Sequence, residues 1–255
     1  KVFDLSGKIP VFSQVREILV PCPIKEEQSI LDLINAEIHT VLVRGDPDVI
    51  QFDETFSLAS QLGGRLFYGG YISQAIPENN PTRNKQIIVS QGGGNVGQQL
   101  LVAAIKTAAL LPDYRFLLAT GSRATPVDMD YLHSLRQSTN VEIVPFLADF
   151  RQKLLASAVS INMGGDNTLL DVISTRTPSL AFPYPGNIEQ TIRINKLAER
   201  GWVTKITDAD LIPTTLKDAI FSVLDKPYPS TPINLNGASN ISRKILEIVN
   251  TTPAL

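Results

Sequence analysis

Apolar residues in this chain gather in short runs that alternate with longer amphipathic stretches. Within the runs, apolar positions are almost continuous rather than alternating, which is the pattern of parallel strands buried on both faces of a sheet. The sequence therefore predicts five buried strands, at residues 87–89, 116–119, 141–144, 158–161 and 179–182.

The stretches between these runs predict helices. The first is rich in Leu, Ala, Gln and Lys, and the second follows Pro126, a residue favoured at the first position of a helix. The predicted helices lie at 96–110, 127–137, 149–156, 168–174 and 189–200. Strand and helix repeated at this spacing indicate βαβ units with right-handed crossovers. The predicted fold is α/β, with a Rossmann-like parallel sheet and helices on both faces.

A smaller block precedes this region. It holds a predicted helix at 24–37, a strand at 39–43, a helix at 53–62 and a strand at 66–71. Two strands make a poor core of their own, so the block is interpreted as a remnant of a larger N-terminal α/β domain. Residues 73–85 have the Pro and Asn content of a linker. The predicted parts are the remnant at 1–74, a linker at 75–85 and a second domain at 86–255, which ends in a helix at 241–249.

Composition and charge exclude several classes of function. The 255 residues carry a net charge of −2 without a long run of one sign, so a nucleic-acid partner is not expected. The single cysteine, Cys22, excludes an intrachain disulfide and suits a reducing compartment. The longest apolar stretch, 100–111, is interrupted by Lys106 and is too short to span a bilayer. No signal peptide opens the sequence, and its first residue, Lys1, predicts a truncated or cleaved chain. A cytoplasmic location is expected.

A glycine-rich loop follows the first predicted strand of the second domain. Its residues Gly92, Gly93, Gly94 and Asn95 stand directly before a predicted helix. Glycines let the backbone approach a ligand closely, and the free N–H groups of a helix start favour an anion such as a diphosphate. The loop matches neither a Walker loop nor a full dinucleotide fingerprint. The alternative is a tight turn without a ligand.

A second such junction follows the strand at 158–161. It comprises Gly164, Gly165, Asp166, Asn167 and Thr168. Junctions after parallel strands all lie at the carboxyl edge of the sheet, where ligands bind, so the two loops are expected to open on one crevice. Farther along the same predicted helix, Asp171 is either a ligand-binding acid or the partner of Thr168 in a capping box.

Together these residues resemble the donor-binding half of B-type glycosyltransferases. The similarity covers 86–206 and is strongest to the family of the bacterial cell-wall, lipid-linked N-acetylglucosaminyltransferase. It rests on Gly164-Gly165-(x)2-Thr168-(x)2-Asp171, Pro178, Pro183, Glu189-Gln190 and Leu197-Ala198-Glu199-(x)-Gly201.

The resemblance implies two Rossmann-like domains that bind a UDP-sugar donor between them. It implies that the first glycine loop contacts the diphosphate, that Asp171 binds the ribose, and that Phe146 and Leu147 frame the base. It also implies that Glu189 and Gln190 contact the donor sugar or the phosphates. Ser122 and Arg123 are weaker candidates, because they follow the strand at 116–119.

Three departures from the family pattern matter. Asp171 replaces the usual Glu, and Arg193 replaces a common Asn, so Arg193 either pairs with a phosphate or faces solvent. The family's N-terminal glycine loop and the histidine after it have no counterpart. The catalytic base is therefore unknown, and the acceptor site is expected outside this sequence.

The predicted function is transfer of a sugar from a UDP-sugar donor to an unknown acceptor, with this chain supplying donor binding. No metal or cofactor is expected, since Asp128-Met129-Asp130 lies at a helix start, where acids are favoured anyway. The alternatives are a nucleotide-sugar epimerase or hydrolase, and a non-catalytic UDP-sugar-binding subunit. The missing N-terminal half would provide contact with a membrane or with a partner chain, so the location could be peripheral to the inner face of a membrane.

Overall fold

A computed structural model describes residues 9–74, 82–92, 96–230 and 232–251 of this chain. The chain divides into two compact units. One comprises Lys1–Ser73 with Thr231–Leu255, and the other comprises Gln74–Ser230. Each unit has a hydrophobic core of its own.

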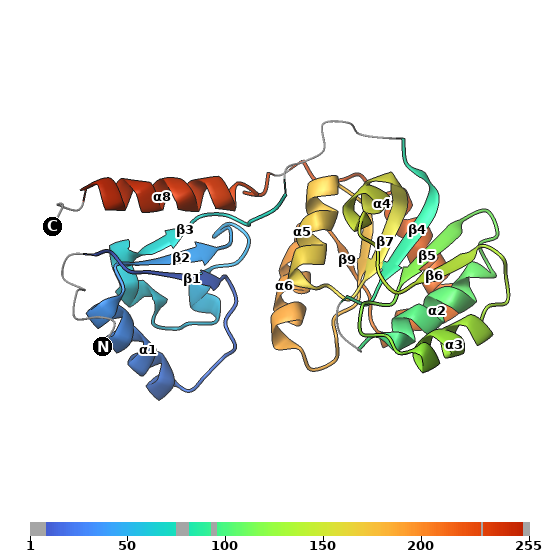
Figure 1. Cartoon of the computed structure of the whole chain (residues 1–255), viewed down its shortest axis with the longest axis horizontal. Coiled ribbons are helices and arrows are strands. Elements are labelled where there is room, and N and C mark those ends of the chain that lie inside the picture. Colours follow the sequence, from blue (N-terminus) through green and yellow to red (C-terminus); the bar gives the residue numbers. More distant parts are fainter. Residues whose placement is uncertain (1–8, 75–81, 93–95, 231, 252–255) are drawn as a thin grey trace. The chain divides into compact units, whose positions relative to one another are not determined.

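The larger unit contains a six-stranded sheet in which every neighbouring pair is parallel (Figure 1). Its strands are β4 (Asn84–Ser90), β5 (Arg115–Ala119), β6 (Val141–Val144), β7 (Ser157–Asn162), β8 (Ser179–Ala181) and β9 (Thr204–Lys205), in the spatial order β6-β5-β4-β7-β8-β9. The five predicted strands are confirmed, as is the α/β class. The sequence missed β9, which has only two residues.

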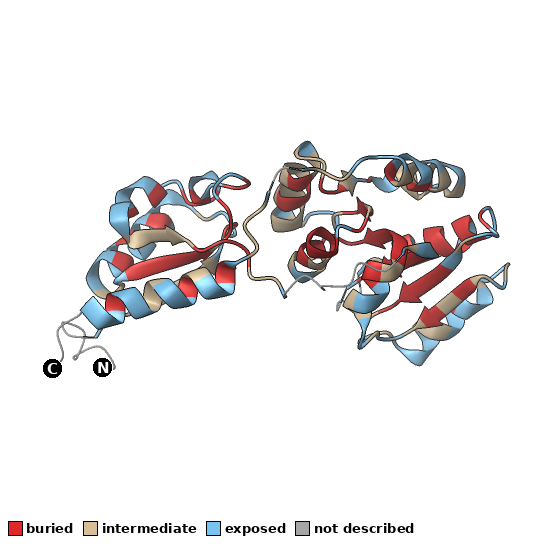
Figure 2. Cartoon of the chain, turned by 90° about the horizontal axis from the view of Figure 1, so that it is seen from above, coloured by how far each residue is buried: buried red, intermediate tan, exposed pale blue. Residues whose placement is uncertain are grey.

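Helices cover both faces of this sheet (Figure 1). On one face lie α2 (Gln98–Ala108), α3 (Pro126–Ser134) and α7 (Pro213–Leu224), and on the other lie α4 (Phe150–Ala156), α5 (Asp166–Thr175) and α6 (Ile188–Glu199). The strands between them are almost wholly buried (Figure 2). This double burial explains their continuous apolar runs. The sequence missed α7.

The strand order fixes where a ligand can bind. The first three strands of the unit, β4 to β6, extend from the centre in one direction, and β7 to β9 extend in the other. Crossovers therefore reverse direction between β4 and β7, and ligands of open α/β sheets bind beyond the carboxyl ends of the strands at such a point. Ser90 at the end of β4 is the register partner of Asn162 at the end of β7, so both following loops leave from the same edge.

The smaller unit contains a three-stranded parallel sheet of β1 (Phe12–Arg16), β2 (Thr40–Arg44) and β3 (Leu66–Tyr68) in sequence order. The helix α1 (Ile24–Glu37) agrees with the prediction. The predicted helix at 53–62 is wrong. Two 3₁₀ segments, η1 (Phe52–Glu54) and η2 (Ala59–Arg65), occupy this region, and Gly63 at φ 51° breaks the second one. The sequence also missed β1, whose side chains are only partly buried.

The last helix, α8 (Gly237–Thr251), belongs to the smaller unit, whereas the sequence assigned it to the second domain at 86–255. Its first residue packs against Gly70 and Tyr71, and Asn240 Nδ2 donates a hydrogen bond of 2.8 Å to the carbonyl of Gly69. Figure 1 shows α8 and α1 on opposite faces of the small sheet. No helix in the described part of the chain has the length and apolar character that a membrane span requires.

Candidate functional site

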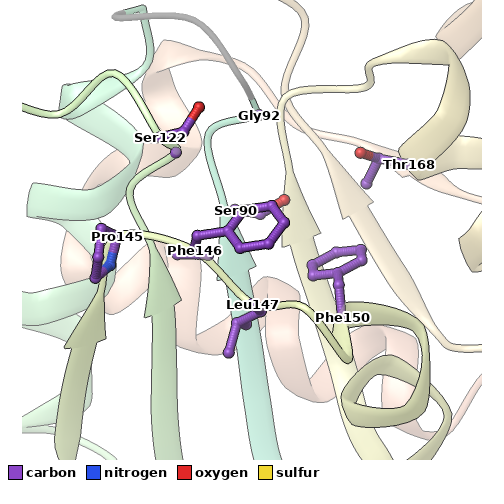
Figure 3. A pocket seen from close by; sticks show the side chains of 10 residues that line it. Ser90, Gly92, Ser122, Pro145, Phe146, Leu147, Phe150 and Thr168 are labelled. Atoms are coloured by element: carbon purple, nitrogen blue, oxygen red, sulfur yellow. The ribbon is translucent and has the colours of Figure 1, made fainter.

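A cavity of about 310 Å³ opens at the carboxyl edge of the larger sheet. Four strand-to-helix junctions contribute to it, and Figure 3 shows their side chains converging on one space. The lining residues are Ser90, Gly92, Ala119, Gly121, Ser122, Pro145, Phe146, Leu147, Phe150 and Thr168. Gly92 of the first predicted loop and Thr168 of the second line this cavity, whereas Gly164, Gly165 and Asp166 do not, and the cavity extends toward the end of β6.

The first glycine loop keeps its backbone open toward the cavity. Gly92 has φ 78°, and a Cβ atom built on it would meet no atom within 4 Å. The helix α2 begins at Gln98, two residues later than predicted, because Gly97 at φ 106° serves as its N-cap. Among the residues that the structure describes, no side-chain hydrogen bond caps this helix start. Gly93, Gly94 and Asn95 lie outside the described residues.

The two glycines of the second loop have different roles. Gly165 is the N-cap of α5, and no side chain caps that helix either. A Cβ atom on Gly165 would meet only the Thr168 hydroxyl, at 4.0 Å. Gly164, in contrast, has φ 68°, and a Cβ there would overlap the Ile194 side chain of α6, with Cγ1 at 2.8 Å. Gly165 therefore offers open backbone, while Gly164 is required for helix packing.

A buried amide holds the second loop in shape. The Asn162 side chain is fully buried, and its Oδ1 accepts a hydrogen bond of 2.9 Å from the N–H of Gly164. Its Nδ2 donates to the hydroxyls of Ser160 and Ser179. No such role was predicted for Asn162, although a polar residue at the end of an apolar strand was a signal for it.

Asp171 is not a capping residue. The helix α5 begins at Asp166, so Asp171 lies in its second turn and the capping-box alternative with Thr168 is wrong. The Asp171 carboxylate is partly buried, and its Oδ1 lies 3.6 Å from Arg151 Nε. Burial raises the pKa of Asp171, and the neighbouring Arg151 guanidinium opposes that rise. Asp171 does not line the cavity itself, but Thr168, three residues earlier on the same helix face, does.

Two aromatic rings enter the cavity from the junction after β6 (Figure 3). Phe146 is 67% exposed, and Phe150 is the first residue of α4. Leu147 also lines the cavity, so the predicted pair Phe146–Leu147 does face it. The sequence missed Phe150, because a large apolar residue at a helix start is ordinarily interpreted as part of the core.

The first turn of α6 is held by its own side chains. Asn187 caps the helix by accepting from the Gln190 N–H at 2.9 Å, and Gln190 Oε1 accepts from the Tyr184 N–H at 2.9 Å. Glu189 Oε1 accepts from Arg193 Nη2 at 3.0 Å. Arg193 is only 2% exposed, so the alternative that it faces solvent is wrong. Its Nε also lies 3.7 Å from Asp166 Oδ1.

The remaining candidates lie around these groups. Ser122 lines the cavity, whereas Arg123 and Asn167 are exposed residues that do not line it. Asp128 caps α3 by accepting from the hydroxyl and the N–H of Thr125. In the described ranges, no three His, Cys, Asp or Glu side chains are grouped so that they could hold a metal ion.

Comparison with known proteins identifies the family of this chain. The family model for the glycosyltransferase family 28 C-terminal domain matches residues 74–245.

The relatives include two enzymes named UDP-N-acetylglucosamine--N-acetylmuramyl-(pentapeptide) pyrophosphoryl-undecaprenol N-acetylglucosamine transferase. The one from Rhodopseudomonas palustris is 21% identical over 260 residues, covering 95% of this chain and 71% of the relative. The one from Thermosipho africanus is 25% identical over 191 residues, covering 74% of this chain and 52% of the relative. An uncharacterized glycosyltransferase of Methanosarcina acetivorans is 25% identical, and the match spans 58% of this chain but only 39% of that protein.

Solved structures agree on the fold. The calicheamicin glycosyltransferase CalG4 matches with a TM-score of 0.61 at 14% identity, over 95% of this chain and 64% of that one. MurG from Acinetobacter baumannii matches with a TM-score of 0.50 at 13% identity, over 89% of this chain and 77% of that one. Both proteins are glycosyltransferases, and the parallel sheet with its two helix layers conforms to the B-type glycosyltransferase fold. The chain therefore belongs to the family 28 glycosyltransferases, whose C-terminal domain it carries.

Proposed function

We propose that this chain binds a UDP-sugar donor at the carboxyl edge of its larger sheet and supplies that donor site to a hexosyltransferase. One observation carries the proposal. The cavity lies where the sheet reverses its strand order, with the two glycine junctions leaving the edge at paired residues Ser90 and Asn162. This is the position at which α/β folds bind nucleotides.

The lining residues suit the parts of a nucleoside diphosphate. Phe146 and Phe150 offer flat apolar surfaces on which a base can stack, and such stacking is worth about 1–3 kcal/mol per base in other nucleotide sites. Asp171 would accept hydrogen bonds from the ribose hydroxyls. The diphosphate would lie at the starts of α2 and α5, where Gly92 and Gly165 leave room for it and uncapped N–H groups favour an anion.

The chemistry that follows is displacement at the sugar. The acceptor nucleophile forms a bond to the anomeric carbon, and the bond from that carbon to the diphosphate oxygen breaks. Negative charge then develops on the leaving diphosphate, and helix N-termini and backbone N–H groups that are already oriented stabilise it without a metal ion. Glu189, as a carboxylate, would contact the donor sugar, and Gln190 would contact the donor sugar or the phosphates.

A thermal-shift panel tests the proposal. Uridine, UMP, UDP and several UDP-sugars are compared with the corresponding adenine, cytosine and guanine compounds. A ligand that binds only the folded state raises the unfolding temperature. At a ligand concentration of a hundred times its Kd, the free energy of unfolding increases by about 2.7 kcal/mol. We expect the largest shifts with UDP and one UDP-sugar. If no nucleotide shifts the transition, the proposed donor site is wrong.

Two other functions are separated by their products. An epimerase or hydrolase of this fold would convert the UDP-sugar without an acceptor, which chromatography of the donor incubated alone detects. A non-catalytic donor-binding subunit would need a partner chain. The three-stranded sheet of the smaller unit, against six strands in the larger one, favours completion by further polypeptide. We propose a cytoplasmic location, with any membrane contact at the acceptor side.

A further inference from the structure

A buried charge cluster lies beside the second glycine loop. Arg193 is the largest of the fully buried side chains, and it is paired with Glu189 at 3.0 Å and with Asp166 at 3.7 Å. Both carboxylates retain some exposure, at 26% and 19% of their side-chain surfaces. The cluster therefore has its cation inside and its anions toward the surface.

The cluster joins two helix starts. Asp166 is the first residue of α5, and Glu189 is the second residue of α6. The next residue after Arg193 is Ile194, whose side chain packs on Gly164 of the loop. The first turns of both helices are thus fixed relative to the glycine loop by one arginine and its neighbour.

These carboxylates create an electrostatic problem for an anion. Acids in the first turn of a helix are stabilised by the positive end of the helix dipole, so they compete for the potential that a diphosphate would use. Two unneutralised carboxylates there would repel the diphosphate. A buried guanidinium that pairs with both offsets this repulsion, and Arg193, which is 2% exposed, does not itself line the cavity.

We propose that Arg193 is a positioning residue of the donor site. It neutralises Asp166 and Glu189 and holds the starts of α5 and α6 in the arrangement that admits a diphosphate. The inference rests on the proposed function, and it replaces the direct phosphate contact that the sequence suggested for Arg193.

Calorimetric titration of the whole chain with UDP and with uridine tests this role. Arg193→Met keeps the volume of the side chain and removes the charge. We expect it to weaken UDP binding roughly tenfold or more and to change uridine binding less than about threefold, because only UDP carries the repelled charge. In the double variant Arg193→Met/Glu189→Gln one carboxylate is gone, so we expect a large part of the UDP affinity to return. UDP has no donor sugar, so loss of a sugar contact at Glu189 does not enter the comparison.

Arg115→Met is the matched control. It removes the same charge from an exposed residue at the start of β5, at the opposite edge of the sheet, and UDP affinity should not change. Arg193→Gln, which also removes the charge but keeps N–H donors for the two carboxylates, replaces Arg193→Met if that variant does not fold, and is then compared with Arg193→Gln/Glu189→Gln. Equal losses for UDP and uridine, or no rescue by Glu189→Gln, overturn the role of Arg193 while leaving the donor site in place. Absence of UDP binding by the unmodified chain overturns the proposed function, and this role with it.

Discussion

Two glycines at the same sheet edge have left-handed backbone conformations for different reasons. Gly92 has open space where a side chain would be, so its conformation leaves backbone exposed in the cavity. Gly164 has no open space at that position, because the Ile194 side chain of α6 packs against it. A glycine-rich motif in a sequence does not separate these roles, since both require φ values that other residues adopt only at a cost of about 1–2 kcal/mol.

Substitution of each glycine by alanine distinguishes their two roles by the loss of stability that it causes. We expect Gly164→Ala to destabilise the larger unit by about 2–4 kcal/mol, as the sum of backbone strain and overpacking against Ile194. Gly92→Ala should cost only about 1–2 kcal/mol, from the backbone alone. Urea unfolding curves of both variants measure the difference. Similar costs at the two positions would contradict the packing role of Gly164.

Asp171 carries the ribose part of the proposed site. We expect Asp171→Ala to weaken UDP binding by about 1–3 kcal/mol, the cost of lost charge-assisted hydrogen bonds, which corresponds to about ten- to a hundredfold in affinity. The carboxylate must exchange or share its contact with Arg151 when it binds the ribose. Calorimetry measures the change, with the exposed acid Asp218 on α7 as the matched control in Asp218→Ala. An unchanged UDP affinity in Asp171→Ala would remove this residue from the site.

The ends of two helices share one arginine at the amino edge of the larger sheet. Arg83 donates to the carbonyls of Leu155 at the end of α4 and of Thr175 and Arg176 at the end of α5, at 2.8–3.0 Å. It also donates to the carbonyl of Ser157 and to the hydroxyl of Thr177. The last carbonyls of a helix have no partner within it and carry negative potential, so a cation there is doubly favourable.

Removal of this arginine should loosen both helix ends. We expect Arg83→Ala to lower the free energy of unfolding of the larger unit by about 2–4 kcal/mol, because hydrogen bonds from a charged group are lost at several carbonyls at once. Arg115→Ala, which breaks the exposed pair with Glu142, should cost less than about 1 kcal/mol. Chemical denaturation of both variants provides the comparison, and equal costs would show that the helix ends do not depend on Arg83.

The elements of the larger unit were predictable where burial left a clear pattern. The strands β4, β5, β7 and β8 are buried on both faces over most of their length, and the resulting apolar runs appear directly in the sequence. The two-residue strand β9 and the partly exposed strand β1 have no such pattern, and the segment around Gly63 has helix-like composition but forms 3₁₀ turns.

For the candidate site, the sequence predicted which loops lie together but not the contacts between their side chains. Parallel strands place all their following loops at one edge, so two glycine junctions could be assigned to one crevice from their order alone. Contacts between side chains of different helices could not be predicted from the sequence, because the spacing of residues along the chain does not determine which helices pack together. The pairing of Arg151 with Asp171 and the burial of Arg193 between Asp166 and Glu189 are of this kind.

Each unit of the chain has a hydrophobic core of its own, and the C-terminal helix α8 belongs to the smaller unit. Gly237 at the start of α8 lies against backbone, since a Cβ atom there would be 2.7 Å from the carbonyl carbon of Tyr71. Its N–H also donates to the carbonyl of Tyr71 at 2.9 Å. The attachment of α8 to the smaller unit thus depends on the absence of a side chain at one position.

A bulky side chain at that position should affect one unit alone. We expect Gly237→Val to displace α8 and to lower the unfolding temperature of the smaller unit, with UDP affinity and the transition of the larger unit unchanged. Scanning calorimetry with and without UDP separates the two transitions, because the ligand should raise only that of the larger unit. Gly64→Val is the control, since no atom lies within 4 Å of the built Cβ there. Loss of both transitions together would show that the two cores unfold as one.

Because residues 231–255 return to the first unit, the polypeptide passes between the units twice, near residue 74 and again near residue 230. A protease that cuts either passage would leave two fragments still joined through the other. The nicked protein would therefore migrate as one species under native conditions and as two only after denaturation.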